Sequence, residues 1–287
     1  MKTCVSIYSF GGYMAQLGIY GVIDKVAELG FEGIDFTLDG DWTNGLDVET
    51  AKKAGEYARE KGLEIAASSC GANFLYGSNG VLMDEVDRLK KFIDFSVALG
   101  SPAMRHDVAN GFTGRKYALG YDVALPRLTE GVRELTKYAE QQGIKTMTEN
   151  HGFYSQDSER VSKLIDSVNH PNFGALVDIG NFMCADEETN KAVGVMAPYA
   201  FHVHAKDFHF KSGMDVFPGE GWFTTRGGNY LRGAIIGHGD AKVFQSVKIL
   251  KRAGYDKFLS IEFEGMEDNL KAIRIGLANL KRFIEQA

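Results

Sequence analysis

The feature that most constrains the fold of this chain is an alternation between short apolar runs and longer stretches with helical periodicity. Short runs rich in β-branched and apolar residues are typical of buried strands, and a 3.6-residue period of apolar residues is typical of amphipathic helices. The predicted strands are Thr3–Ser9, Gly33–Thr37, Glu64–Ser69, Ala103–Asp107, Lys145–Glu149, Gly174–Asp178, Ala200–Lys206 and Lys257–Glu262. The predicted helices are Val22–Leu29, Val48–Lys61, Leu82–Leu99, Asp122–Gln142, Ser158–Val168, Thr189–Met196, Ala241–Ala253 and Met266–Ile284.

Glycine marks the ends of many of these predicted helices. The chain has 34 glycines among 287 residues, well above the average of about 7%. Five of them, Gly30, Gly62, Gly100, Gly143 and Gly254, follow directly after a predicted helix. A left-handed residue at the end of a helix favours glycine, because glycine has no Cβ to clash. These glycines therefore support a regular series of helix-to-strand turns.

Strict alternation of strands and helices predicts parallel strands joined by right-handed crossovers. Eight such units close into a (β/α)₈ TIM barrel, which needs about this length of chain. We therefore predict an α/β fold, with residues 1–287 as a single barrel domain. A doubly wound open sheet is the alternative, but the turn after the first strand, Phe10–Tyr13, lacks the GxGxxG pattern typical of that fold.

One long segment interrupts the alternation after the seventh predicted strand. Asp207–Asp240 contains eight glycines together with Trp222, Phe223, Tyr230 and two adjacent isoleucines. Connections longer than about 15 residues are usually functional or disordered. The aromatic and aliphatic residues favour an ordered active-site lid, and a disordered linker is the alternative.

The charge and cysteine content exclude some classes of function. Acidic residues outnumber basic ones by 38 to 32, so a net charge of −6 argues against a nucleic-acid-binding surface. No apolar run approaches the roughly 20 residues that span a bilayer, and the N-terminus lacks the features of a signal peptide. Cys4, Cys70 and Cys184 are widely spaced and are typical of reduced buried thiols. We expect a cytoplasmic protein whose partners are small molecules rather than nucleic acids or membranes.

Ionisable residues stand at the ends of four predicted strands. Glu149, Asp178 and Glu262 end the fifth, sixth and eighth strands, and His204 lies near the end of the seventh. The active site of such a barrel lies at the carboxyl ends of its strands. A buried carboxylate must be paired or metal-bound, and three carboxylates with one imidazole suit a divalent cation. Taken singly, each residue also fits a helix cap, a first-turn acid or a core histidine.

At these positions the sequence resembles the xylose isomerase-like TIM-barrel superfamily, which includes ketose 3-epimerases, inosose dehydratases and endonuclease IV. The matching motifs occur in the expected order over nearly the whole chain. They are Gly30–Asp35, Glu149, Val177–Asp178, His204–Asp207, Gly237–Asp240 and Ser260–Glu262. Each motif is weak alone, and the ordered set specifies the superfamily better than it specifies a substrate.

The resemblance implies one divalent ion held by Glu149, Asp178, His204 and Glu262. Mn²⁺ is the first choice, with Mg²⁺, Co²⁺ or Zn²⁺ as alternatives. It also implies that Glu149 and Glu262 act as acid and base on opposite faces of a bound ketose, while the metal stabilises an enediolate. The implied function is a metal-dependent isomerase or epimerase of a sugar or polyol-type keto substrate. Relatives commonly associate, so a homo-oligomer remains open.

Two departures from the epimerase pattern leave the reaction open. Asn181 stands where epimerases usually have a histidine, and Phe153–Ser155 offers no second glutamate downstream of Glu149. His151 is therefore a third candidate acid or base. A keto-sugar or inosose dehydratase or lyase is one alternative, and a non-catalytic sugar-binding barrel is another. Endonuclease IV activity is disfavoured, because it requires a histidine-rich cluster of three zinc ions.

Other polar residues near the predicted strand ends or in the long segment are candidates for substrate contacts. These candidates are Tyr8, Arg105, His106, Asn181, Lys206, Arg232 and His238, followed by Asn73 and Arg226. Arg226 and Arg232 would suit an anionic group on the substrate, although ordinary surface charge explains them equally. Trp42 is a candidate for stacking on a sugar face.

Overall fold

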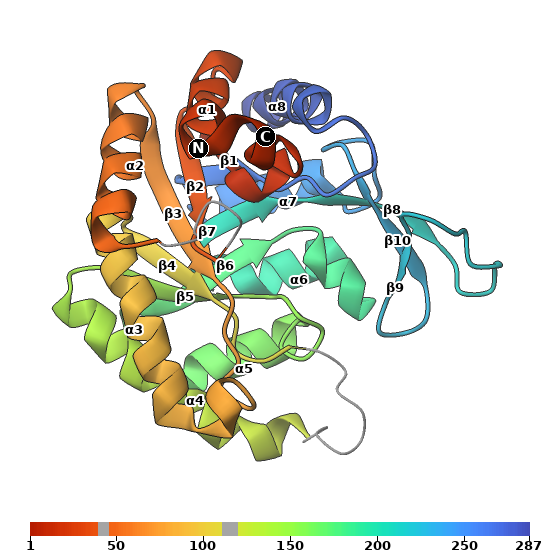
Figure 1. Cartoon of the computed structure of the whole chain (residues 1–287). Helices are drawn as coiled ribbons and strands as arrows, with labels where there is room; N and C mark the ends of the chain where they lie inside the picture. Colours follow the sequence, from red (N-terminus) through yellow and green to blue (C-terminus); the bar gives the residue numbers. More distant parts are fainter. Residues whose placement is uncertain (40–45, 111–119) are drawn as a thin grey trace.

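The chain folds into the expected (β/α)₈ barrel, surrounded by helices (Figure 1). The computed structural model describes residues 1–39, 46–110 and 120–287, so Trp42 lies outside the described residues. Eight parallel strands close the barrel in the order β1-β11-β7-β6-β5-β4-β3-β2. The prediction of a single parallel TIM barrel is therefore confirmed.

The barrel strands match the predicted runs closely. They are β1 (Lys2–Ser6), β2 (Gly33–Thr37), β3 (Glu64–Cys70), β4 (Ala103–His106), β5 (Lys145–Glu149), β6 (Phe173–Asp178), β7 (Ala200–Ala205) and β11 (Phe258–Ile261). The helices are α1 (Tyr13–Leu29), α2 (Val48–Glu60), α3 (Leu82–Leu99), α4 (Tyr121–Gln141), α5 (Ser158–Val168), α6 (Thr189–Met196), α7 (Val243–Arg252) and α8 (Asn269–Gln286). Short 3₁₀ turns occur at η1 (Ile7–Phe10), η3 (Ser78–Gly80), η4 (Asn181–Ala185) and η5 (Ala197–Tyr199).

The beginning of the chain differs most from the expected boundaries. The first strand ends at Ser6 rather than Ser9, because the Ser6 hydroxyl accepts a hydrogen bond from the Tyr8 amide and starts η1. The first helix begins at Tyr13 rather than Val22, and it bends at Gly18, whose φ is 63°. Glycine tolerates this non-helical backbone conformation, so two helical segments meet at a kink at Gly18.

The five glycines predicted to end helices all adopt positive φ. Their values lie between 78° and 85°, as expected for left-handed helix ends, at Gly30, Gly62, Gly100, Gly143 and Gly254. Each therefore directs the chain back toward the next strand. This part of the glycine excess is explained by the repeated turns of the barrel.

The strands bring an apolar layer and a polar layer together inside the barrel. Met147 and Leu176 belong to a small buried apolar cluster with Ala67 and Ala103. Side chains alternate along a strand, so Glu149 points to the same side of β5 as Met147, and Asp178 to the same side of β6 as Leu176. The apolar layer thus lies beneath carboxylates at the carboxyl end of the barrel.

The Asp207–Asp240 segment is ordered, as expected, but it is more than a loop. It contains β8 (Asp207–Lys211), β9 (Phe223–Thr224) and β10 (Tyr230–Ala234), which pair as an antiparallel sheet in the order β8-β10-β9. Figure 1 shows this sheet projecting from the side of the barrel. The Asp207 carboxylate accepts hydrogen bonds from the amides of Gly237, Gly239 and Ala241, which fastens the two ends of the segment together.

Two further sequence expectations concern the thiols and the membrane. Cys4, Cys70 and Cys184 are buried and form no disulfide. Within the described residues, no helix has both the length and the apolar character needed to cross a membrane.

The packing of α2 against α3 predicts a sharp effect of substituting Gly55. A Cβ at this position would lie 2.0 Å from the backbone oxygen of Leu99, so α2 would have to move away from α3. We expect Gly55→Ala to lower the free energy of unfolding by about 1–3 kcal/mol in urea titrations. Gly194→Ala is the matched control, because a Cβ added at this position of α6 would have no atom within 4 Å. That change should be neutral or stabilising by up to about 1 kcal/mol.

Candidate metal and substrate site

A pocket of about 270 Å³ opens at the carboxyl ends of the barrel strands. Nearly all of the residues that line it have polar or charged side chains, which suits a hydroxylated molecule better than an apolar one. The lining residues are Tyr8, Thr37, Asp39, Ser69, Gly71, Arg105, Asp107, Glu149, His151, His204, Lys206, Glu262 and Glu264. The structure therefore gathers most of the predicted site residues in one place.

The four predicted metal ligands converge within this region. Ligand atoms of Glu149, Asp178, His204 and Glu262 all lie within 4.8 Å of one another. His204 Nδ1 is 3.5 Å from Glu262 Oε1, 3.8 Å from Glu149 Oε1 and 3.9 Å from Asp178 Oδ2. Buried His204 Nδ1 and Asp178 Oδ2 have no hydrogen-bond partner among the described residues. Two such atoms facing one another fit a cation site, because buried polar atoms are normally paired.

The charges around the pocket also fit a divalent cation. Among the described residues of the site, six carboxylates face two permanent cations, Arg105 and Lys206. The carboxylates belong to Asp39, Asp107, Glu149, Asp178, Glu262 and Glu264. Burial raises the pKa of Asp178 to about 7; Lys206 opposes the rise, and Glu149 and Glu262 add to it. A bound divalent ion would compensate the excess negative charge of these carboxylates, since a metal is often the largest local charge in its site.

Lys206 lies directly beside the ligand cluster. Its ammonium group is 2.6 Å from Glu262 Oε2, 3.4 Å from Glu264 Oε2 and 3.8 Å from Asp178 Oδ2. Although burial opposes the charged carboxylate, Lys206 and His204 hold the pKa of Glu262 well below its usual range. Lys206 therefore keeps Glu262 in the ionised form that can ligate a metal.

Glu149 is held from two sides. Its Oε2 is 2.5 Å from Arg105 Nη2, and its Oε1 accepts a hydrogen bond of 3.0 Å from the Asn181 amide nitrogen. Arg105 also contacts Asp107 at 2.8 Å. Asn181 reaches this position because η4 begins directly after β6, where its backbone amide donates to Asp178 Oδ1. Arg105 and Asn181 thus fix the direction of the Glu149 carboxylate.

His151 is the one candidate acid or base that is substantially open to the pocket. Its side chain is 46% exposed, and its Nδ1 lies 2.8 Å from Asp107 Oδ1. Partial desolvation opposes the charged ring, but the Asp107 carboxylate outweighs it and raises the pKa of His151. An imidazolium held in this way can donate a proton to a molecule in the pocket.

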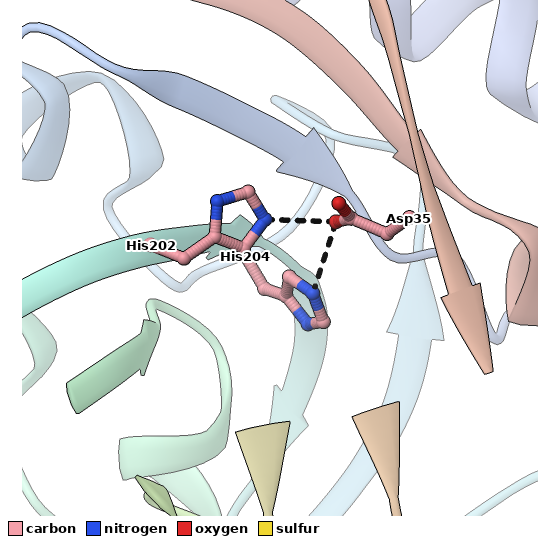
Figure 2. Close-up of side chains that lie close together, drawn as sticks. All are labelled: Asp35, His202 and His204. Carbon is pink, nitrogen blue, oxygen red and sulfur yellow. Dashed lines mark hydrogen bonds and ion pairs between the residues drawn. The ribbon is translucent and has the colours of Figure 1, made fainter. Parts of the chain in front are cut away.

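Behind the ligand cluster, Asp35 joins two histidines of β7 (Figure 2). Asp35 Oδ2 is 2.8 Å from His202 Nε2 and 3.5 Å from His204 Nε2, and all three side chains are buried. Burial opposes the charged carboxylate, yet His202 and His204 hold the pKa of Asp35 below its usual value. A carboxylate at Nε2 of His204 leaves Nδ1 directed at the other ligands, which is the usual support for a metal-binding histidine.

The structure corrects one predicted substrate contact, and it places two others outside this pocket. His106 is completely buried outside the pocket, packed between Phe74 and Phe173, and burial lowers its pKa to about 4. Strand alternation explains the error, because Arg105 and His106 must face opposite sides of β4. Arg232 and His238 do not line the pocket.

Two arginines of the Asp207–Asp240 segment, and Asn73 outside it, contact other protein groups. Arg232 lies over the ring of Trp222 and near Glu267. Arg226 contacts Asp157 Oδ2 at 2.6 Å. Asn73 caps its own turn by accepting hydrogen bonds from the amides of Leu75 and Tyr76. These contacts account for the arginines and Asn73 without a substrate.

Several pocket residues escaped prediction from the sequence. They are Thr37, Asp39, Ser69, Gly71, Asp107 and Glu264, together with Asp35 behind the ligands. Asp35 carried a usable signal, because it is a charged residue within an otherwise apolar strand. Thr37 and Ser69 carried none, since small polar residues at strand ends are common everywhere.

Comparison with known proteins places the chain in a family. Residues 23–283 match the family model described as xylose isomerase-like TIM barrel. The chain belongs to this family. A search of curated proteins gave no match. The resemblance seen in the sequence motifs is therefore confirmed at the level of the family.

Several solved structures share this fold. One from Mycobacterium smegmatis in complex with magnesium is 17% identical, with a TM-score of 0.74 over 99% of this chain and 96% of that one. The probable 3-DHS dehydratase AsbF of Bacillus anthracis is 16% identical, with a TM-score of 0.73 over 98% and 99%. D-psicose 3-epimerase of Clostridium cellulolyticum H10 is 13% identical, with a TM-score of 0.75 over 99% of both chains. At these identities the likeness shows the shared fold.

The contact behind His204 predicts that Asp35→Asn weakens metal binding. The amide would keep the shape but lose the negative charge that holds Nε2 of His204. Loss of such support typically reduces metal affinity by about 10- to 100-fold. We expect this loss in titrations of Mn²⁺ into the protein. Asp94→Asn is the matched control, because Asp94 lies on α3 and accepts a hydrogen bond from Tyr138 of α4. It should leave the affinity for Mn²⁺ unchanged. An equal loss of affinity in this variant would contradict the role given to Asp35.

Proposed function

We propose that this protein is a metal-dependent isomerase or epimerase that moves a proton at a carbon beside the carbonyl group of a sugar or polyol-type substrate. The observation that carries the proposal is the convergence of three carboxylates and His204 Nδ1 on one polar pocket. Membership of a family whose structural neighbours include ketose 3-epimerases supports it.

In this proposal Glu149, Asp178, His204 and Glu262 hold one divalent ion, with Mn²⁺ as the first choice. When bound, such an ion acts as a Lewis acid that stabilises negative charge on substrate oxygens. Asp178 is the most deeply buried of the three acids and serves only as a ligand. Glu149 and Glu262 both line the pocket, so their carboxylates are also within reach of a substrate.

Glu149 and Glu262 are placed to exchange protons with a substrate from different directions. Glu149 is the last residue of β5 and Glu262 follows β11, and these two strands are separated in the barrel by β6 and β7. Arg105 and Asn181 orient Glu149, and Lys206 orients Glu262. One carboxylate removes the carbon-bound proton, and the other returns a proton to the opposite face of the same carbon. This arrangement inverts a stereocentre.

Dehydration is the second candidate, and His151 favours it. Loss of water after proton removal requires an acid that protonates the departing hydroxyl. The raised pKa of His151, its exposure to the pocket and its contact with Asp107 supply such an acid. A barrel neighbour described as a probable dehydratase supports this alternative. The two reactions share their first step and differ in the mass of the product.

The proposal is tested by exchange of carbon-bound hydrogen. Protein loaded with Mn²⁺ should transfer deuterium from D₂O into at least one member of a panel of ketoses and keto-inositols, and a chelator should abolish this transfer. Glu149→Gln and Glu262→Gln should each slow it by about 10²- to 10⁴-fold, the usual contribution of an acid or base. Mass spectrometry of the product distinguishes epimerisation from loss of water.

Glu267→Gln is the matched control, because Glu267 lies outside the pocket lining and pairs with Arg232. It should exchange deuterium like the wild type. Binding of a ketose without any exchange or water loss would instead assign the protein as a non-catalytic sugar-binding barrel.

The charges of the site predict that metal affinity increases with pH. The metal-free protein carries a proton on Asp178 below about pH 7. His204 also holds a second proton: burial opposes its charge, but Glu262 and Asp35 raise its pKa well above the ordinary value. A metal must displace both protons, so affinity should fall by up to about tenfold per pH unit for each proton displaced.

Calorimetric titration of Mn²⁺ in buffers of different ionisation enthalpy measures both quantities. Measurements one pH unit below and above the pKa of Asp178 should show weaker binding and greater proton release on the acid side. Affinity that is independent of pH, with no proton released, would show that the site is already deprotonated.

A further inference from the structure

A second pocket lies at the opposite, amino-terminal end of the barrel and has no part in the proposed reaction. Its volume is about 430 Å³. It is lined by the beginnings of several strands and the residues before them, namely Lys2, Glu64, Ile65, Ala66, Pro102, Ala103, Lys145, Phe201, His202, Asp256, Lys257 and Phe258. Its floor is apolar and its rim is charged.

The acidic groups at this rim are already neutralised. The Glu64 carboxylate pairs with Lys2, and the Asp256 carboxylate pairs with the N-terminal amine, each at 2.5 Å. Lys145 and Lys257 form no ion pair within the part of the chain that the structure describes. The pocket therefore carries the uncompensated charge of two ammonium groups.

Both ammonium groups lie over the same ring, that of Phe201. Lys145 Nζ lies 4.5 Å and Lys257 Nζ 5.5 Å from the centre of the Phe201 ring. Lys257 Nζ also donates a hydrogen bond of 3.5 Å to the Phe201 carbonyl oxygen. Burial lowers the pKa of Lys257, and the charge of Lys145 lowers it further. Two like charges in one pocket repel each other, and a bound anion would relieve that repulsion.

A buried polar atom faces the same pocket from the barrel interior. His202 lines the pocket although it is only 3% exposed. Its Nε2 is held by Asp35 (Figure 2). His202 therefore joins the barrel interior to this pocket.

We propose that this amino-terminal pocket binds a small phosphate monoester. Lys145 and Lys257 contact the phosphate, since lysine acts as a point charge for phosphate groups. The apolar floor formed by Ile65, Ala66 and Phe258 packs against the organic part. The site is separate from the metal cluster and does not depend on the function proposed for it.

The test uses phenyl phosphate as the probe and calorimetry as the first measurement. Wild-type protein should bind it, with phenol binding undetectably. The double variant Lys145→Ala/Lys257→Ala should bind about tenfold more weakly or worse, because hydrogen bonds to charged groups are lost. Lys145→Arg/Lys257→Arg should keep binding. Lys52→Ala/Lys53→Ala, which removes two exposed lysines of α2, is the matched control and should bind like the wild type.

The position of the bound probe is measured by trace acetylation and mass spectrometry. Phenyl phosphate should protect Lys145 and Lys257 from acetylation and leave Lys52 and Lys53 unprotected. Any of three results would overturn the proposal: no binding to wild-type protein, equal binding by the Lys145→Ala/Lys257→Ala variant, or protection of Lys206 in place of the two rim lysines. None of these results bears on the metal-dependent reaction.

Discussion

The convergence of like charges inside a closed barrel is the constraint on which the site depends. Parallel strands all end on the same side, so barrel closure forces Glu149, Asp178 and Glu262 toward one another whatever their charge. Buried carboxylates are costly unless they are compensated. Lys206 and Arg105 supply part of that compensation, and the unpartnered atoms of Asp178 and His204 mark where further positive charge would bind. The charge conflict within the cluster would therefore favour a bound cation.

The barrel interior separates into layers, and the charged groups of the candidate metal site are confined to one of them. Met147, Leu176 and their small apolar partners fill one layer, and the ligand cluster lies above it. Asp35 of β2 and His202 of β7 form a hydrogen bond inside the barrel, so the interior also contains these polar groups. Because His202 faces the amino-terminal pocket while Asp35 faces His204, the Asp35 carboxylate connects the two ends of the barrel through its contacts with both histidines.

Features with a periodic sequence signal could be predicted, and features that depend on side-chain direction could not. The strand and helix pattern and the glycine turns follow from local spacing. The four candidate ligands follow from the family resemblance, and the structure brings them together. His106 was wrong because a strand places neighbours on opposite faces, and the sequence alone does not tell which face is inside. Arg232 and His238 lie outside the pocket lining because the Asp207–Asp240 segment folds into its own sheet, whose contacts are set by pairing across long separations.

The replacement of the expected histidine by Asn181 bears on which reaction the site suits. Asn181 donates to Glu149, and its carbonyl oxygen lies 3.4 Å from Lys206 Nζ, so it joins the groups that orient the two candidate glutamates. An amide can orient a carboxylate but cannot carry a proton at neutral pH. In the proposed reaction, proton transfer would therefore fall on the glutamates and on His151, which contacts Asp107. With an amide beside Glu149 and the half-exposed imidazole of His151 in the pocket, the proposed acid would be His151 rather than a group at position 181.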